Sequence, residues 1–287
     1  MPFQQLAIFG PGLIGGSVAL AAREHGLCDR LALWSRDDHE RTAARKLAVA
    51  DVITGDPAEA VRGADLVLLC TPPASLPTLA RTIALHLEPG AIISDVASVK
   101  AGLVEELTEI FHCPGETGSR FVGAHPMAGA ERHGLGAARA NLFERCVCLL
   151  TPLANRTEPG ALETVWGFWR GLGASVREMT PQAHDAAVAT VSHLPHVLAA
   201  ALASLPDEAA TRCAGPGWRD MTRLAGGSPE LWTEILSHNR GPVTDALRGM
   251  ISRLGEVLVL LEAGRESDLE KFLLSAKLRR TERPPIS

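Results

Sequence analysis

A glycine-rich turn close to the start of the chain constrains the fold more than any other feature. Residues 5–9 form a short apolar run, and the turn 10–17 (GPGLIGGS) follows directly, ahead of an alanine-rich stretch with helical periodicity. Gly10 permits the tight turn, Gly12 lets the backbone approach a pyrophosphate, and Gly15 lets the helix pack close to the strand. The order of strand, glycine turn and helix predicts a dinucleotide-binding fold, in which the amide groups at the helix start face the phosphates.

The end of the second strand bears on which dinucleotide is bound. Proteins that bind NAD in this way normally carry an acidic residue there, which accepts hydrogen bonds from the adenosine ribose. Ser35 stands at that place and Arg36 follows it, so we expect NADP in preference to NAD. Asp37 and Asp38 come next and could reach back to the ribose, which would favour NAD. Alternatively, Arg36 is a solvated loop cation and the protein accepts both cofactors. The predicted cofactor-binding residues are Gly10, Gly12, Leu13, Ile14, Gly15, Ser35, Arg36, Thr71 and Pro72.

Strand-like and helix-like segments alternate through the first half of the chain. Apolar, strand-like runs lie at 31–34, 65–70, 91–95, 121–124 and 146–150, and helical patterns separate most of them. Alternation of this kind predicts an α/β fold, a Rossmann-like doubly wound parallel sheet with helices on both faces.

The pattern changes near Thr180-Pro181, after a short edge strand at 174–177. Beyond this point we find helical patterns alone. We therefore predict two domains, with residues 1–180 for dinucleotide binding and residues 181–287 as an all-helical domain. Its helices are rich in alanine and leucine and expose more apolar surface than a domain of that size easily buries. This favours a homodimer built through the helical domain, and burial against the first domain is the alternative.

The composition is that of a globular protein with a substantial core, since 46% of the residues are hydrophobic and 21% are charged. A net charge of −5 gives no sign of a surface for nucleic acid or an anionic membrane. We count no apolar run that could span a bilayer, and the chain enters a strand at once with no signal peptide. We therefore expect a cytoplasmic protein.

The six cysteines contain no CxxC pair. Cys146 and Cys148 fall on one face of an apolar strand, where cysteine usually serves as a small hydrophobic residue. We expect neither a disulfide nor a metal site from them.

Two segments at predicted strand ends carry candidate chemistry. In residues 94–100 (SDVASVK), Asp95 and Ser98 have the ordinary alternative of capping the next helix, and Lys100 that of a solvated helix residue. His125 ends the next strand, followed by Pro126 and flanked by glycines, which is not typical of core packing. Because imidazole exchanges a proton near neutral pH, His125 is the predicted catalytic residue.

A third cluster lies in the helical half. His184-Asp185 is followed by His193 and His196, and then by two arginine-containing segments around residues 219–223 and 239–240. The HxxH pair could bind zinc, but no Glu or Cys stands at helical spacing to complete a site, so we expect no metal. Arginines near histidines suit a substrate with carboxylates, and an ionic lattice at a dimer interface is the alternative.

These motifs occur together in one order: GPGLIGGS, SDVASVK, GAHPMAG with Glu131, the HD and SHLPH pair, and RDMTRLAGGSPELW. The set resembles the prephenate dehydrogenase family, which includes arogenate and cyclohexadienyl dehydrogenases, over residues 1 to about 280. The resemblance implies a nucleotide domain followed by a helical dimerisation domain. It also implies oxidative decarboxylation of prephenate to 4-hydroxyphenylpyruvate, with hydride transfer to a nicotinamide cofactor, in tyrosine biosynthesis.

The resemblance assigns roles residue by residue. His125 resembles the histidine that accepts a hydrogen bond from the ring hydroxyl and takes its proton, and Ser98 the serine that orients both groups. Arg223 resembles the arginine that grips the ring carboxylate. His193 and His196 resemble the histidines near the pyruvyl side chain, and Trp232 resembles a wall of that pocket. Glu131, Arg219 and Asp220 resemble parts of an ionic gate and dimer network around the site.

Three alternatives stay open at this point. Arogenate differs from prephenate only by an ammonium in place of the keto group, and His196 favours the keto acid by resemblance. A nucleotide-binding sensor with an inactive site is disfavoured by the intact His125, Ser98 and Arg223. A β-hydroxyacid dehydrogenase normally relies on a lysine in its second domain, and no lysine lies between Lys100 and Lys271. The sequence departs from the family pattern at Ser35-Arg36 and around residues 215–217.

Overall fold

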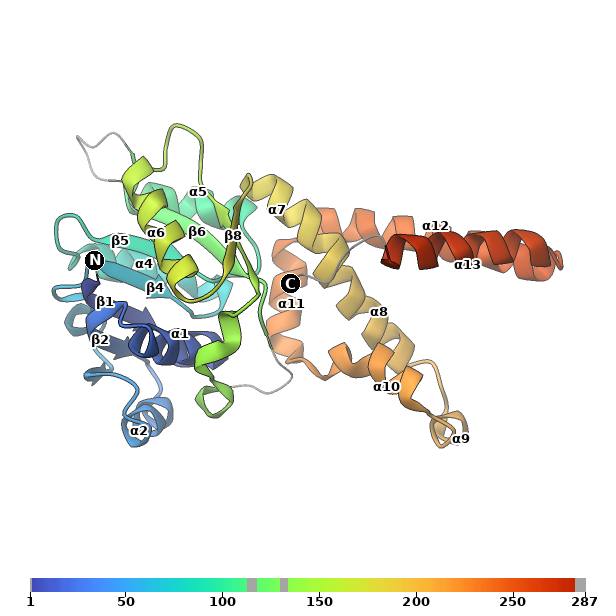
Figure 1. Cartoon of the computed structure of the whole chain (residues 1–287), viewed down its shortest axis with the longest axis horizontal. Helices are drawn as coiled ribbons and strands as arrows, with labels where there is room; N and C mark the ends of the chain where they lie inside the picture. The colour runs from blue at the N-terminus through green and yellow to red at the C-terminus, as the bar shows by residue number, and fades with distance from the viewer. Residues whose placement is uncertain (1, 113–117, 130–133, 282–287) are drawn as a thin grey trace. The chain divides into compact units, whose positions relative to one another are not determined.

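The computed structural model describes residues 2–112, 118–129 and 134–281. It divides into two compact units, Met1–Asp185 with Gly226–His238, and Ala186–Ala225 with Asn239–Ser287 (Figure 1). The segment Gly226–His238 thus belongs to the first unit, although it lies within the part of the sequence expected to be the helical domain.

The first unit is built on one eight-stranded sheet with the order β3-β2-β1-β4-β5-β6-β7-β8. The strands are β1 (Phe3–Phe9), β2 (Cys28–Trp34), β3 (Val52–Thr54), β4 (Leu66–Leu69), β5 (Ile92–Asp95), β6 (Phe121–Pro126), β7 (Val147–Thr151) and β8 (Ser175–Glu178). The first six are parallel, which confirms the predicted doubly wound α/β fold. Two features were not predicted from the sequence: β3, and the antiparallel pairing of β7 with β6.

Helices cover both faces of this sheet (Figure 1). They are α1 (Leu13–Glu24), α2 (Asp38–Lys46), α3 (Pro57–Val61), α4 (Leu76–Ala84), α5 (Ala101–Ile110) and α6 (Pro159–Gly171), with short turns η1 (Pro73–Ser75), η2 (Leu135–Ala137) and η3 (Ala140–Phe143). The first unit also contains α11 (Pro229–His238), which contacts η1. Alternate residues of β1 enter different cores: Leu6 and Ile8 pack with α1 and α6, whereas Ala7 and Phe9 pack with α4 and α5. Burial on both faces explains why the strands are continuous apolar runs.

The register of the central strands brings their carboxyl ends to one edge. Leu69 pairs with Asp95, and Ser94 pairs with Val122 in the next strand. The strand order reverses between β1 and β4, and ligands of such sheets bind outside the carboxyl ends at this reversal. The glycine turn, the residues after β4, the loop after β5 and His125 at the end of β6 therefore share this edge.

The described residues of the second unit form helices joined by turns and contain no strand, as predicted. Helix α7 (Pro181–Val188) begins in the first unit and continues through a π-helical turn, η4 (Ala189–His193), into α8 (Leu194–Ala203). The other elements are α9 (Glu208–Thr211), α10 (Pro216–Thr222), η5 (Arg223–Gly226), α12 (Arg240–Glu262) and α13 (Glu266–Thr281).

One helical stretch, Pro181–Ala203, is long and apolar enough to cross a membrane by length and composition, and the sequence analysis had counted none. Core helices meet the same criterion. This stretch carries His184, Asp185 and His193, which are buried and make polar contacts inside the protein. Those contacts would have no counterpart in lipid, so length and composition alone are weak grounds for a membrane span.

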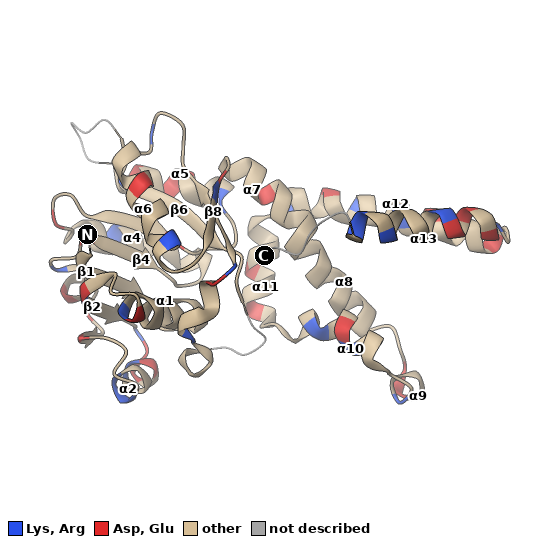
Figure 2. Ribbon diagram, viewed as in Figure 1, with Lys and Arg blue, Asp and Glu red and all other residues tan. Residues whose placement is uncertain are grey.

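Helices α12 and α13 leave apolar side chains exposed. Ile251, Leu254, Leu258 and Leu261 recur at helical spacing on α12, and each is more than half exposed. Leu273, Leu274 and Leu278 on α13 are also exposed. Charged side chains are distributed along both helices as well (Figure 2).

Candidate active site

The glycine turn has the geometry that a pyrophosphate needs. Gly10 has φ +103°, and a Cβ there would lie 2.9 Å from the Cys70 carbonyl oxygen. A Cβ on Gly15 would lie 2.1 Å from the Gly10 carbonyl oxygen, so both positions require glycine. A Cβ on Gly12 would meet nothing within 4 Å, which leaves the backbone open at the start of α1, where no side chain caps the helix. These residues fit a bound dinucleotide phosphate.

The end of β2 holds an acidic side chain that the sequence analysis missed. Ser35 is buried, and its hydroxyl donates a hydrogen bond to Glu40 Oε2 at 2.6 Å. Helix α2 brings Glu40 back to the strand end because the helix starts only a few residues after Ser35. Arg41 donates to the Ser35 carbonyl oxygen at 2.7 Å, while Arg36 is exposed. The Glu40 carboxylate and the Arg41 guanidinium therefore both contact Ser35, at the strand end where the sequence predicts binding of the adenosine ribose.

The turn after β4 carries Thr71 and Pro72, and helix α11 docks beside it. The Ser75 hydroxyl donates to Thr71 Oγ1 at 3.0 Å, which orders the turn. Glu234 on α11 accepts a hydrogen bond from the Ala74 amide. Trp232 lies half-buried on the same helix, so the structure places it in the first unit.

A buried ion pair organises the loop after β5. Asp95 and Lys100 are both fully buried, and Lys100 Nζ lies 2.6 Å from Asp95 Oδ2. Lys100 also donates to the Ala97 carbonyl oxygen at 2.8 Å. Asp95 accepts from the amides of Ala97 at 2.9 Å and Ala124 at 3.1 Å. The pair thus joins the loop that carries Ser98, which is half-buried, to the residue before His125. Lys100 is therefore not the solvated helix residue that the sequence left as an alternative.

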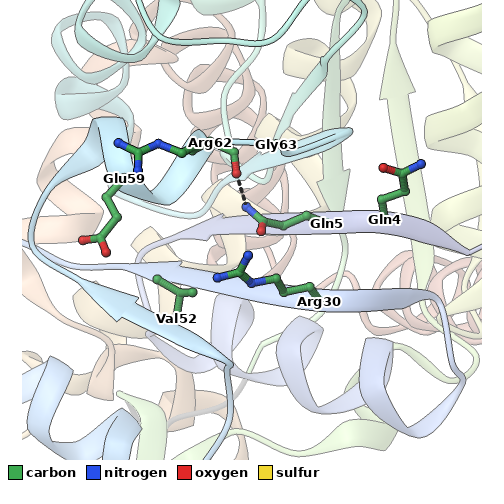
Figure 3. Close-up of a pocket in the computed structure, with 7 residues that line it drawn as sticks. All are labelled: Gln4, Gln5, Arg30, Val52, Glu59, Arg62 and Gly63. Carbon is green, nitrogen blue, oxygen red and sulfur yellow. Dashed lines mark hydrogen bonds between the residues drawn. The ribbon is translucent and has the colours of Figure 1, made fainter.

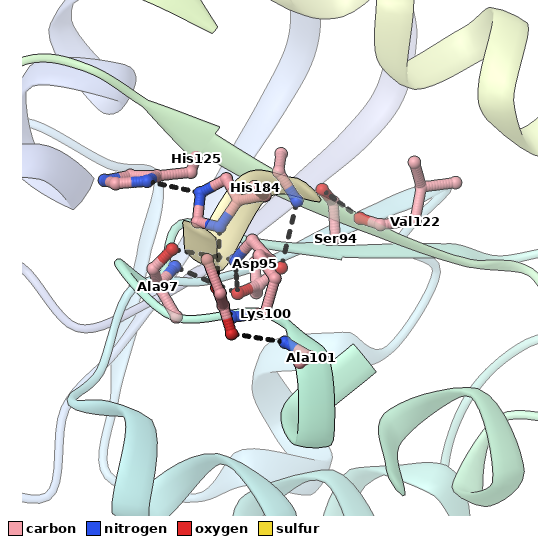
Figure 4. A network of polar contacts seen from close by, with 10 residues as sticks. Ser94, Asp95, Ala97, Lys100, Ala101, Val122, His125 and His184 are labelled. Atoms are coloured by element: carbon pink, nitrogen blue, oxygen red, sulfur yellow. Dashed lines mark hydrogen bonds and ion pairs between the residues drawn. The ribbon is translucent and has the colours of Figure 1, made fainter. Parts of the chain in front are cut away.

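His125 lies at one end of a series of buried polar groups (Figure 4). It is 7% exposed, and its Nδ1 lies 2.8 Å from Nε2 of His184. His184 Nδ1 in turn lies 2.7 Å from Asp185 Oδ1. Asp185 accepts hydrogen bonds from the amides of Lys100 and Ala101, both at 2.8 Å, and so caps the start of α5.

The charges in this chain are set by burial and by these hydrogen bonds. Burial lowers the pKa of His184 below its ordinary value, although the hydrogen bond to Asp185 opposes that shift. Burial alone would raise the pKa of Asp185. The hydrogen bonds from His184 and the α5 amides outweigh it and hold that pKa below its ordinary value. Near neutral pH the pair is a neutral imidazole and a carboxylate.

Five of the other predicted substrate residues lie in the second unit. His193 is buried in η4, where Asn239 Nδ2 donates to its Nδ1 at 3.0 Å. His196 is buried on α8, and burial lowers its pKa. Arg219 and Asp220 on α10, and Arg223 at the start of η5, are exposed. Glu131 lies outside the described residues.

The sequence analysis assigned no role to His184 and Asp185 beyond noting them in a cluster. No local signal shows that they support His125, because the contact forms only when α7 packs against β6 and the start of α5. Among the described residues, no group of three or more His, Cys, Asp and Glu side chains is placed to hold a metal ion.

A separate pocket of about 480 Å³ lies at the opposite edge of the sheet, where strands begin (Figure 3). Gln5 lines it and donates to the Arg62 carbonyl oxygen at 2.8 Å. Arg30 and Glu59 also line this pocket. It contains neither the glycine turn nor a histidine and is therefore not the candidate active site.

The fold and this edge are those of a dinucleotide-binding α/β protein with a buried histidine at the carboxyl ends of its strands. Comparison with known proteins gives two family matches: "Prephenate dehydrogenase, nucleotide-binding domain" over residues 18–178, and "Prephenate dehydrogenase, dimerization domain" over residues 180–275. The cyclohexadienyl dehydrogenase of Zymomonas mobilis is 33% identical, and the match covers 96% of this chain and 95% of that relative.

Solved structures of prephenate and arogenate dehydrogenases are similar to this chain. The prephenate dehydrogenase from A. aeolicus, in complex with hydroxyphenyl propionate and NAD+, superposes with a TM-score of 0.89 at 30% identity, covering 98% of this chain and 99% of that one. The arogenate dehydrogenase of Synechocystis gives a TM-score of 0.80 at 30% identity, covering 97% and 99%. The chain belongs to the prephenate dehydrogenase family, which confirms the resemblance seen in its motifs.

Proposed function

We propose that this protein oxidises prephenate and removes its ring carboxylate to give 4-hydroxyphenylpyruvate, with a nicotinamide dinucleotide as oxidant, in tyrosine biosynthesis. The observation that carries this proposal is the buried His125 at the carboxyl edge of the sheet that also presents the glycine turn, in a chain of this family.

His125 is the proposed general base. When bound, the nicotinamide accepts the hydride that leaves C4 of the substrate ring. His125 takes the proton of the hydroxyl on that carbon, and Ser98 orients the hydroxyl. The ring carboxylate then leaves as carbon dioxide, its bonding electrons enter the ring, and the ring becomes aromatic. His125 returns its proton to the phenolate oxygen, so the reaction releases no net proton. General-base catalysis of this kind raises the reaction rate roughly 10²–10⁴-fold.

The remaining residues are proposed to hold the substrate. Prephenate carries two carboxylates, and a guanidinium binds a carboxylate through two parallel hydrogen bonds. We assign Arg223 to the ring carboxylate. The proposed contacts of the pyruvyl side chain are His193, His196 and Trp232, and the proposed ionic gate is Glu131, Arg219 and Asp220.

The cofactor preference that we propose is NADP over NAD. It is supported by serine rather than an acid at the end of β2 and by the exposed Arg36 beside it. The hydrogen bond from Ser35 to Glu40 opposes it, because a 2′-phosphate can use the Ser35 hydroxyl only after Glu40 releases it.

We further propose a homodimer formed through the helical unit. The match to a dimerisation domain supports it, as does the exposed apolar stripe on α12. Burial of such a stripe against a second copy removes apolar surface from water.

Steady-state rates with prephenate and arogenate, each with NAD+ and NADP+, test the proposal. We expect reduced cofactor and 4-hydroxyphenylpyruvate from prephenate, with the higher kcat/KM on NADP+. A higher kcat/KM with arogenate than with prephenate would identify arogenate as the preferred substrate and leave the proposed reaction chemistry unchanged. No cofactor reduction with either substrate, in a protein that binds the dinucleotide, would contradict the proposed function.

A further inference from the structure

We infer that His184 and Asp185 are positioning residues that keep His125 in the tautomer with its proton on Nδ1, so that Nε2 carries the lone pair that accepts the substrate proton. This inference rests on the proposed role of His125 as the base. It extends the site to two residues that were given no role in the proposed function.

The argument starts at Asp185, whose carboxylate is tied to the start of α5. Its Oδ1 accepts from the Lys100 amide and its Oδ2 from the Ala101 amide, both at 2.8 Å. The amide groups at a helix start favour a negative charge, and an ionised carboxylate can only accept hydrogen bonds. The 2.7 Å contact with His184 therefore requires a proton on His184 Nδ1.

The state of His184 follows from its burial. It is fully buried, and the titratable groups around it are Asp95, Lys100, Asp185 and His125. Burial lowers its pKa, and the Lys100 ammonium acts in the same direction. Because the α5 amides share the charge of Asp185, that carboxylate pulls less strongly for a second proton on His184. A neutral His184 with its proton on Nδ1 carries its lone pair on Nε2.

That lone pair decides the tautomer of His125. The 2.8 Å contact between His184 Nε2 and His125 Nδ1 needs one proton, and only His125 can supply it. Neutral His125 then has its lone pair on Nε2. If His184 were an imidazolium, it would donate to His125 Nδ1 instead, and His125 Nε2 would hold a proton and could not act as a base. The hydrogen bonds that run from the α5 amides through Asp185 and His184 to His125 thus select the His125 tautomer that can act as a base.

The first test is ¹⁵N NMR of the histidine ring nitrogens in the free wild-type protein near neutral pH. The signals of His125 are assigned by their loss in the His125→Asn variant. We expect a protonated Nδ1 and an unprotonated Nε2. A proton on Nε2 of neutral His125 would overturn the inference. Because no substrate is present, this result does not depend on whether prephenate is the substrate.

The second test separates positioning from simple support of the fold. In His184→Gln the amide oxygen can take the place of Nε2 and still accept from His125. In His184→Asn the shorter amide reaches Asp185 but not His125. We expect kcat to fall roughly 10–100-fold in His184→Asn, with KM little changed, and less in His184→Gln. The control is Asp207→Ala, which removes the side-chain cap of α9 in an exposed part of the second unit and should leave kcat unchanged.

Equal kcat in wild type and His184→Asn would contradict the positioning role. If His184→Asn does not fold, His184→Gln and the wild-type NMR result still decide the question. If His125→Asn keeps full activity, the proposed function of His125 fails, whatever tautomer the NMR experiment finds.

Discussion

Replacing Lys100 with methionine should strongly destabilise the protein. Lys100 and Asp95 are fully buried, with 2.6 Å between Nζ and Oδ2, and methionine has a similar shape without the charge. The variant leaves the Asp95 carboxylate with the Ala97 and Ala124 amides but without its cation. It also removes the donor to the Ala97 carbonyl oxygen. Loss of one partner from a buried ion pair costs about 3–5 kcal/mol, so we expect a loss of that size in the free energy of unfolding.

Denaturant unfolding measured by circular dichroism provides the assay. The control is Arg23→Met, because Arg23 and Asp51 form a partly exposed surface pair at 2.9 Å, which should contribute at most about 1 kcal/mol. The double variant Asp95→Asn with Lys100→Met should lose less than Lys100→Met alone, since no unpaired charge remains. A loss below about 1 kcal/mol in Lys100→Met, equal to that in the surface control, would refute the reasoning.

Four further predictions follow from the site and the helical unit. Arg223→Ala should raise the KM for prephenate at least about tenfold, and lysine should restore it only in part, because the fork of two hydrogen bonds is lost; an unchanged KM would place Arg223 outside the site. The free energy of unfolding should fall as the pH drops below about 6.5, because His184 binds a proton at its ordinary pKa only when unfolded. In His184→Gln the pH dependence of the free energy of unfolding should be weaker. The same pH dependence as in the wild type, measured by urea titration, would show that His184 is not its cause. Arg36→Ala should lower kcat/KM with NADP more than with NAD, and Glu40→Gln should favour NADP; a wild-type preference for NAD that neither change affects would defeat this reading. Leu258→Arg should convert the proposed dimer to a monomer in sedimentation experiments, and an unchanged mass would show that the exposed α12 side chains lie outside the interface.

The elements that the sequence predicted well are those set by a few neighbouring residues. Only glycine fits at Gly10 and Gly15, because a Cβ at either position would collide with nearby backbone. This requirement is visible in the sequence as the spacing of the glycines. The antiparallel direction of β7 could not be predicted, because an apolar run at 146–150 looks the same in either direction. Strand β3 has only three residues, Val52–Thr54, and is too short for its pattern to be recognised.

The candidate site shows the same division between local and distant causes. His125 could be predicted because it ends a strand between glycines. The support beneath it could not, because Asp185 caps α5 from 84 residues further along the chain. A lysine at the start of a helix is normally exposed to solvent, and only the position of Asp95 in the folded chain explains the burial of Lys100. Glu40 reaches Ser35 because α2 begins where it does, which a residue-by-residue comparison of strand ends overlooks.

The most direct test of the account is kcat for prephenate oxidation in His125→Asn. Asparagine can hydrogen-bond the ring hydroxyl but cannot take its proton. We predict a fall in kcat of roughly 10²-fold or more, with the Kd of the dinucleotide unchanged and the circular dichroism spectrum retained. A kcat close to that of the wild type, with the same product, would contradict the claim that His125 is the base.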